Sequence, residues 1–186
     1  MNNAYQRKKE PELVRQRILD SAIQLATEKG VASMSIQAVA DMAGVTKGGV
    51  FHHFANKHLL IENMLQYILM QFDQEVDHQI TQDSQPYGCF TRAYIELTLT
   101  NEAFGVHSLW ASLSMIMVTE KSFSDLWNNW LAQRLQRHEA TDSDIQLKIL
   151  RYAADGAWFI ESLDPKKMDD LLILKEELIQ RSYSPT

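Results

Sequence analysis

The 186-residue sequence is 45% apolar and 23% charged and has a formal net charge of −6, which is typical of a folded globular protein and excludes a disordered chain. No apolar run approaches the roughly 20 residues that cross a bilayer, and the N-terminus lacks the apolar segment of a secretory signal, so we expect a cytoplasmic protein without membrane partners. Cys89 is the only cysteine, which argues against an internal disulfide and a cysteine-based zinc site and predicts a small buried side chain.

The charge is divided unevenly along the chain. Residues 1–72 carry a net charge of +2, whereas residues 73–186 carry −8. Because nucleic acid attracts positive charge, only the first part is suited to a DNA-binding surface. Five basic residues gather near the start of this part: Arg7, Lys8, Lys9, Arg15 and Arg17.

Short helices are predicted in the first part of the chain. Pro11 suits the first turn of a helix, and apolar residues then recur at helical spacing, which predicts a helix over about residues 11–29. Ser35 is a good N-cap for a second helix, which Gly44 ends, and Thr46 caps a third helix only two residues later. This short connection predicts a helix-turn-helix.

The remaining sequence is also predicted to be helical. Asn56 caps a long helix over about residues 57–80, which runs into a polar segment that ends at Pro86. Apolar spacing then predicts five more helices, near Tyr87–Thr100, Glu102–Thr119, Ser122–Glu139, Ser143–Leu163 and Lys167–Ser182. We therefore expect an all-α protein with no strands.

Two adjacent glycines near the start of the third helix require an explanation. Gly48 and Gly49 each cost a helix about 0.8–1 kcal/mol relative to alanine. Close approach of the helix backbone to DNA would explain them, while an ordinary weak helix start is the alternative. Lys57 stands in the first turn of the fourth helix, where the helix dipole opposes a cation unless an external phosphate is bound.

The segment from Ala43 to Phe54, followed by Asn56-Lys57, resembles the tetracycline-repressor (TetR) family of bacterial regulators. The resemblance extends over about residues 15–65, and beyond it only the helical layout and the length match. It implies that the third helix enters the DNA major groove, that Lys57 contacts phosphate, and that the later helices form a dimerising, effector-binding domain. The expected organisation is thus an N-terminal arm and three-helix helix-turn-helix DNA-binding domain over residues 1–57, followed by a helical-bundle ligand-binding and dimerisation domain over residues 58–186.

The candidate DNA contacts combine the residue chemistry with this resemblance. Gly49 and Phe51 depart from the family, which often has a small side chain at the first position and a tyrosine at the second. Gln37 is expected to read adenine through paired hydrogen bonds, and His52 to donate a hydrogen bond to phosphate. The full set of candidates is Ser35, Gln37, Thr46, Lys47, Gly48, Gly49, Phe51, His52 and Lys57.

The last two predicted helices offer a dimer surface. Their small residues permit close helix approach and their apolar stripe can bury area against a second copy, although a fully buried final helix is the alternative. Two copies would read the half-sites of a palindromic operator. The candidates for the interface are Ala153, Ala154, Gly156, Ala157, Leu171, Leu172, Leu178 and Ile179.

Large adaptable side chains in the middle helices are candidates for an effector pocket, although such side chains more often fill a core. The candidates are Phe104, His107, Trp110, Ser114, Met117, Trp127, Trp130 and Trp158. We expect a largely apolar small molecule that releases the protein from its operator by favouring a second conformation, with no cofactor and no metal. Catalytic motifs are absent from the sequence, which leaves a helical partner-binding or scaffold protein without specific DNA binding as the rival interpretation.

Overall fold

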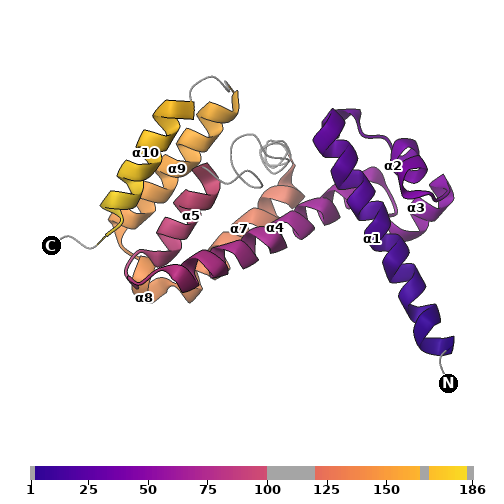
Figure 1. Cartoon of the computed structure of the whole chain (residues 1–186), viewed down its shortest axis with the longest axis horizontal. Coiled ribbons are helices and arrows are strands. Elements are labelled where there is room, and N and C mark those ends of the chain that lie inside the picture. The colour runs from indigo at the N-terminus through magenta and orange to yellow at the C-terminus, as the bar shows by residue number, and fades with distance from the viewer. Residues whose placement is uncertain (1–2, 100–119, 164–167, 184–186) are drawn as a thin grey trace. The chain divides into compact units, whose positions relative to one another are not determined.

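The computed structural model describes residues 3–99, 120–163 and 168–183, and these are helices joined by short connections, with no strand among them. The expected all-α fold is confirmed (Figure 1). The chain divides into two compact units, Met1–Tyr67 and Ile68–Thr186, and the division falls within the long helix α4, Lys57–Gln82. No helix in the described ranges is long and apolar enough to cross a membrane.

The N-terminal unit contains α1 (Asn3–Lys29), the 3-10 turn η1 (Val31–Ser33), α2 (Ile36–Ala43), α3 (Lys47–His53) and the start of α4. The three predicted helix caps are confirmed. Ser35 Oγ accepts a hydrogen bond from the Ala38 amide at 3.1 Å, and Thr46 Oγ1 accepts one from the Gly49 amide at 3.0 Å. Asn56 Oδ1 accepts one from the Leu59 amide at 2.8 Å. Gly44 ends α2 with a φ of 64°, a left-handed conformation that favours glycine.

The predicted start of α1 is wrong. We placed Pro11 in the first turn, but the helix begins at Asn3 and Pro11 lies inside it. Proline fits the helical φ, but inside a helix it removes one backbone hydrogen bond and its ring crowds the carbonyl four residues earlier, at a cost of about 3 kcal/mol. The preceding run of good helix formers, Gln6-Arg7-Lys8-Lys9-Glu10, favours continuation of the helix toward the N-terminus.

A small apolar core holds α3 in place. Val50 and Phe54, one helical turn apart, are both buried, as are Ile18 and Ala22 of α1 and Val39 of α2. Helix α1 packs against both α2 and α3. The opposite face of α3 is left exposed.

The C-terminal unit contains the rest of α4, then α5 (Cys89–Leu99), α7 (Lys121–Arg137), α8 (Glu139–Asp142), α9 (Ile145–Leu163) and α10 (Met168–Arg181). Helices α5, α9 and α10 pack against one another (Figure 1). The predicted bounds of α5, α7, α9 and α10 are within two residues of the observed ones. The short helix α8 was not predicted, and the helix expected at Glu102–Thr119 lies outside the described residues.

Candidate nucleic-acid interface and ligand pocket

The exposed face of α3 begins at its N-terminus. Lys47, Gly48, Phe51 and His52 are exposed, whereas Val50 and Phe54 anchor the helix from below. Phe51 is an exposed large apolar side chain, and Lys47 Nζ lies 6.0 Å from the centre of its ring. The segment Lys47–His53 contains no acidic residue. This face therefore presents backbone amides and positive charge to solvent, which suits a phosphate backbone.

The two glycines of α3 are not required by the packing of the chain. A Cβ atom at Gly48 would meet only Thr46 Oγ1, at 3.8 Å, and one at Gly49 would lie 3.4 Å from Thr46 Oγ1 and 3.5 Å from Val45 Cβ. These are ordinary van der Waals distances. Neither glycine has a positive φ, so alanine would fit the backbone as well. Nothing in the described structure explains why the helix gives up the stability that alanine would supply.

Lys57 is the first residue of α4 and is half-buried. Neither Lys47 nor Lys57 forms an ion pair with a residue in the described ranges. A cation at a helix N-terminus opposes the helix dipole. An external anion would reverse this unfavourable term.

Three predicted DNA contacts have side chains with intramolecular hydrogen-bond partners: Thr46, which caps α3, Ser35 and Gln37. Gln37 Nε2 donates to Asp41 Oδ1, one turn further along α2, at 2.7 Å. Ser35 is engaged as the α2 cap. Both side chains are exposed, but contact with a base would require Gln37 to exchange its existing hydrogen bond.

The tryptophans predicted for an effector pocket fill the interior of the C-terminal unit. Trp130 Nε1 donates to Asp73 Oδ1 at 2.5 Å, and the rings of Trp127 and Trp130 lie 4.9 Å apart. Phe72 also contacts both rings. Trp158 is half-buried against the α5, α9 and α10 core. The other candidates, Phe104, His107, Trp110, Ser114 and Met117, lie outside the described residues.

A buried arginine fastens α7 to α4. Arg134 is 1% exposed, and its guanidinium donates to Asp73 Oδ1 at 2.5 Å, to the Asp73 carbonyl at 2.6 Å and to Asp77 Oδ1. The hydrogen bond from Arg134 lowers the pKa of Asp77 below its ordinary value. This network is structural, because each of its polar groups already has an intramolecular partner.

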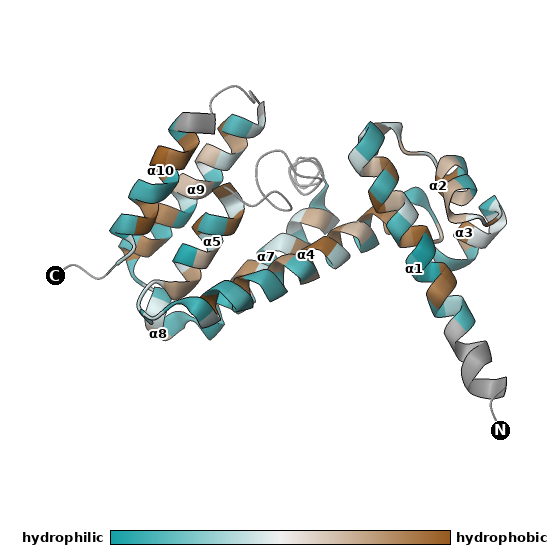
Figure 2. Ribbon diagram, in the orientation of Figure 1, coloured by the Kyte–Doolittle hydropathy of each residue, from teal (hydrophilic) through white to brown (hydrophobic). Residues whose placement is uncertain are grey.

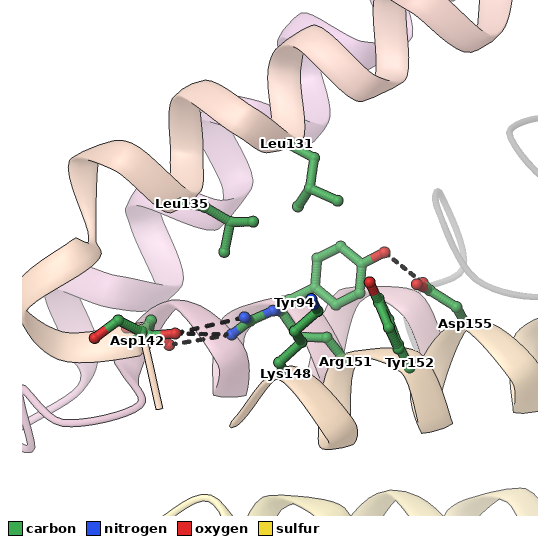
Figure 3. Close-up of a pocket in the computed structure, with 9 residues that line it drawn as sticks. Tyr94, Leu131, Leu135, Asp142, Lys148, Arg151, Tyr152 and Asp155 are labelled. Atoms are coloured by element: carbon green, nitrogen blue, oxygen red, sulfur yellow. Dashed lines mark hydrogen bonds and ion pairs between the residues drawn. The ribbon is translucent and has the colours of Figure 1, made fainter. Parts of the chain in front are cut away.

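A pocket of about 240 Å³ lies between α5, α7, α8 and α9 (Figure 3). The two leucines Leu131 and Leu135 of α7 line one side, one helical turn apart. The polar part of the lining consists of Tyr94, Asp142, Ser143, Lys148, Arg151, Tyr152 and Asp155. Spacings of three and four residues bring the last four to one face of α9. None of the three described tryptophans, Trp127, Trp130 and Trp158, lines it.

Most polar groups of the pocket are paired with each other. Tyr94 is buried and donates its hydroxyl to Asp155 (Figure 3). Burial raises the pKa of both Tyr94 and Asp155. Arg151 donates to Thr91 Oγ1 at 2.6 Å and pairs with Asp142 at 3.9 Å. The exposed Lys148 and Tyr152 are left at the opening.

Asp142 also holds the N-terminal turn of α5. Its Oδ1 accepts hydrogen bonds from the Thr91 amide at 2.8 Å and from Thr91 Oγ1 at 2.6 Å. Its Oδ2 accepts one from Thr141 Oγ1 at 2.8 Å. Cys89 is buried beside it, as predicted, and burial together with the charge of Asp142 raises the pKa of the thiol.

The predicted dimer residues fall into two groups. Ala154, Ala157, Leu171 and Leu178 belong to the chain's own core, and Ala153 and Ile179 pack partly against it. These four side chains are at most 9% exposed, so they could contribute little area to an interface with a second copy. Gly156 and Leu172 are exposed.

Leu172 and seven side chains outside the predicted set are exposed and apolar on α9 and α10, where apolar residues are visible in Figure 2. On α9 they recur every three or four residues around Gly156. The exposed members are Ile145, Ile149, Tyr152, Phe159 and Ile160 of α9, with Leu172, Ile173 and Leu174 of α10. The sequence already contained this spacing, but it does not by itself say which side of a helix faces the core.

Comparison with known families agrees with both units. Residues 18–64 match the model of the "Bacterial regulatory proteins, tetR family", and residues 88–181 match the "Tetracyclin repressor-like, C-terminal domain". The chain belongs to the TetR family. This family is made up of transcriptional regulators rather than enzymes.

Curated TetR-family relatives match parts of the chain. The HTH-type transcriptional regulator TtgR of Pseudomonas putida is 28% identical over 91 residues, which cover 48% of this chain and 43% of TtgR. The match thus spans less than half of the length of this relative. The HTH-type transcriptional repressor KstR2 of Rhodococcus jostii is 23% identical over 77% of this chain and 76% of the repressor.

Solved structures share the TetR fold over most of the chain. The multidrug binding protein EbrR complexed with ethidium has a TM-score of 0.69 and 24% identity, covering 90% of this chain and 97% of EbrR. SmeT, the repressor of the multidrug efflux pump SmeDEF of Stenotrophomonas maltophilia, has a TM-score of 0.64 and 21% identity, covering 90% and 87% of the two chains.

Proposed function

We propose that this regulator binds a palindromic DNA operator as a homodimer, acts as a repressor, and leaves the operator when a small molecule binds the C-terminal unit. The observation that carries the DNA-binding part is the exposed tip of α3. Its glycines have no steric or conformational reason within the chain. Close approach to a DNA groove gives them one, because a helix without Cβ atoms at its tip can lie nearer to the duplex.

The charges around this tip support the same assignment. Lys47 is exposed at the start of α3, and Lys57 is at the start of α4. Each would gain from a phosphate, since the N-termini of their helices carry positive partial charge. We assign the sequence-independent contacts to Lys47, Lys57 and His52, and the close approach to Gly48 and Gly49.

Operator affinity as a function of salt tests this proposal. The operator is selected from random duplexes, and affinity is measured by fluorescence anisotropy at several salt concentrations. Lys57→Gln should weaken binding and flatten the slope of log affinity against log salt by about 1.8, since a dimer loses two phosphate contacts. Lys29→Gln is the matched control, because Lys29 is an exposed lysine in the last turn of α1.

Two outcomes would contradict the DNA-binding assignment. One is that Lys57→Gln and Lys29→Gln change the slope equally. The other is that the folded wild-type protein binds no duplex at low salt, which would favour the rival function of a helical partner-binding protein.

The exposed stripe of α9 and α10 supports the dimer. On α9, large exposed apolar side chains recur on adjacent turns, and Leu172, Ile173 and Leu174 add exposed apolar side chains on α10; exposed apolar area of this kind is typical of an interface. Gly156 lies within the stripe, and a Cβ atom there would meet nothing within 4 Å. A twofold axis through this surface would bury the same residues on both copies.

Sedimentation analysis of a charge substitution tests the dimer. Ile173→Asp should shift the protein toward monomer, because it places a charge in the proposed interface. Leu13→Asp on α1 is the control, since the two side chains are 67% and 66% exposed. Equal dimer dissociation constants for the wild type and Ile173→Asp would refute this interface.

The pocket beside Tyr94 is our proposed effector site. Its volume of about 240 Å³ is below the usual range of 300–1,000 Å³ for ligand pockets, so we assign it a small, largely apolar molecule. Leu131 and Leu135 would contact the apolar part, and Lys148 or Tyr152 a polar group at the opening. EbrR, which shares the fold, is described as a multidrug binding protein, which supports a ligand role for this region.

Filling the pocket tests the effector site. Operator binding is measured with a panel of small aromatic probes such as indole, phenol and benzoate, and the most effective probe is carried forward. Leu131→Trp should abolish the response to that probe while leaving operator affinity unchanged. Ala132→Trp, on the exposed side of α7, should respond like the wild type. An undiminished response of Leu131→Trp would place the effector elsewhere.

A further inference from the structure

The corner between α5, α7 and α8 brings together a thiol, an imidazole and a carboxylate. Cys89 is the first residue of α5, His138 connects α7 to α8, and Asp142 ends α8. One ligand atom from each lies within 4.8 Å of the other two. Cys89 and Asp142 are buried and His138 is half-buried. We propose that these three residues bind a zinc-class divalent metal ion.

The geometry is close to that of a bound ion. Zinc holds sulfur at about 2.3 Å and nitrogen or oxygen at about 2.0–2.2 Å, which places tetrahedral ligand atoms roughly 3.3–3.8 Å apart. Cys89 Sγ already lies 4.0 Å from Asp142 Oδ2. The ligand atoms of the three residues all lie within 4.8 Å of one another, so a contraction of at most about 1.5 Å at any pair would complete the site, with water in the fourth position.

His138 supplies the observation that points most directly to a ligand. Its Nε2 is buried and has no hydrogen-bond partner among the described residues. Such a nitrogen costs free energy unless something binds it. The imidazole also stacks on the ring of Phe90, at 5.4 Å between centres and 9° between planes, which holds it in a fixed orientation.

Asp142 can serve as a ligand and still cap α5. Its two short bonds to Thr91 use Oδ1, whereas Oδ2 has one short bond, to Thr141, and longer contacts with the Phe90 amide at 3.4 Å and with Cys89. A carboxylate has about four acceptor positions. Binding would convert the Cys89 thiol to a thiolate and release its proton to solvent, so the weak contact from sulfur to Oδ2 would be replaced by a shared ion.

The donor set indicates the class of metal. Thiolate and imidazole together suit zinc, and a single carboxylate is a common third ligand of an open zinc site. Magnesium and calcium prefer all-oxygen sites. Arg151 lies 3.9 Å from Asp142 Oδ1 and donates to Thr91 and to the Asp142 carbonyl, so it offsets the charge of the carboxylate.

Cobalt spectroscopy tests the site on the untagged 186-residue chain after treatment with a chelator. Because Cys89 is the only cysteine, a thiolate-to-cobalt charge-transfer band can come from this corner alone, whatever the surface histidines bind. We expect the band to saturate at one cobalt ion per chain and to be absent from Cys89→Ser. His138→Gln should weaken cobalt binding at least about tenfold.

His78→Gln is the matched control, since His78 is an exposed histidine on α4. Zinc should raise the melting temperature of the wild type and of His78→Gln but not of His138→Gln. The last variant loses the stacking on Phe90 but no hydrogen bond of Nε2, and circular dichroism checks that it is folded. The proposal is overturned if folded wild-type protein gives no band with excess cobalt, or if His138→Gln binds cobalt as tightly as the wild type. Neither result bears on operator binding, so this proposal and the proposed function stand or fall separately.

Discussion

The tip of α3 and the surroundings of Arg134 use charged side chains in opposite ways. Lys47 and His52 are exposed at the tip, next to glycines that the packing of the chain does not require. Arg134 is almost fully buried, and Asp73 and Asp77 accept its hydrogen bonds. An external partner should therefore be sought at charged side chains that have no ion-pair partner within the described structure, and at residues such as the α3 glycines that lower helix stability without a reason in the packing.

The largest expected effect concerns Arg134. Arg134→Met should lower the unfolding free energy by about 3 kcal/mol, because it removes the donor that Asp73 and Asp77 share. Breaking a buried ion pair costs about 3–5 kcal/mol, and the low end applies here because both carboxylates are partly exposed. Urea unfolding followed by tryptophan fluorescence measures it, since all four tryptophans lie beyond residue 100. Arg137→Met is the control, because Arg137 is 57% exposed, and it should cost less than about 1 kcal/mol. If both variants lost the same unfolding free energy, the buried, hydrogen-bonded Arg134 would contribute no more to stability than the exposed Arg137.

The next effect concerns Tyr94. Tyr94→Phe should destabilise the C-terminal unit by about 1–3 kcal/mol, because Asp155 would lose its buried donor. The same urea experiment measures it. Tyr152→Phe, at the exposed opening of the pocket, should change stability by less than about 0.5 kcal/mol. If Tyr94→Phe proved neutral, the pairing inside the pocket would contribute nothing to the fold.

At the tip of α3, one substitution is expected to raise stability and to weaken operator binding. Gly48→Ala should stabilise the N-terminal unit by about 0.8–1 kcal/mol, because alanine favours the helix and its Cβ fits. The same substitution should weaken operator binding, because the methyl group would keep the helix from the duplex. Amide hydrogen exchange of α1–α3 measures the first effect and anisotropy the second. A variant that is both more stable and equally tight on DNA would leave the glycines unexplained.

The smallest effect is a pH dependence at Asp77. The hydrogen bond from Arg134 lowers the pKa of this carboxyl in the folded protein, so its stabilising contribution is present above the unfolded pKa of about 3.9 and is lost as the pH falls through the lower folded pKa. Asp77→Asn should therefore lower stability at pH 7 by no more than about 1 kcal/mol. The gap between variant and wild type should close on acidification below pH 4. A gap that stays constant to pH 2 would mean that the charge of Asp77 is irrelevant.

The elements set by local chemistry could be predicted from the sequence. Ser35, Thr46 and Asn56 cap their helices within three residues of themselves, so a short window contains the whole signal. Pro11 misled the prediction because proline favours the first turn of a helix and is unfavourable inside one, whereas α1 extends past it to Asn3. Helix α8 is only four residues long, too short for any periodicity to indicate it.

The pocket and the metal-ligand corner depend on contacts between distant residues. Tyr94 meets Asp155 across 61 positions, and no spacing rule predicts that pair. His138 and Asp142 are four residues apart in the sequence. Cys89, the third residue of the corner, lies near them only in the folded structure. A single cysteine in the sequence argues against a zinc site, whereas the positions of His138 and Asp142 beside Cys89 in the structure argue for one. Likewise, apolar spacing alone could not separate Ala154 and Leu171 in the core from Ile173 on the surface.

Asp142 belongs to both the pocket lining and the corner with Cys89 and His138. If the Asp142 carboxylate moves when the metal ion binds, the lining of the pocket changes, and the reverse also holds. Should an ion and an organic molecule both bind this unit, thermodynamic linkage requires each to change the affinity of the other by the same factor. The response of the protein to the organic molecule would then depend on the metal ion through a single side chain, Asp142.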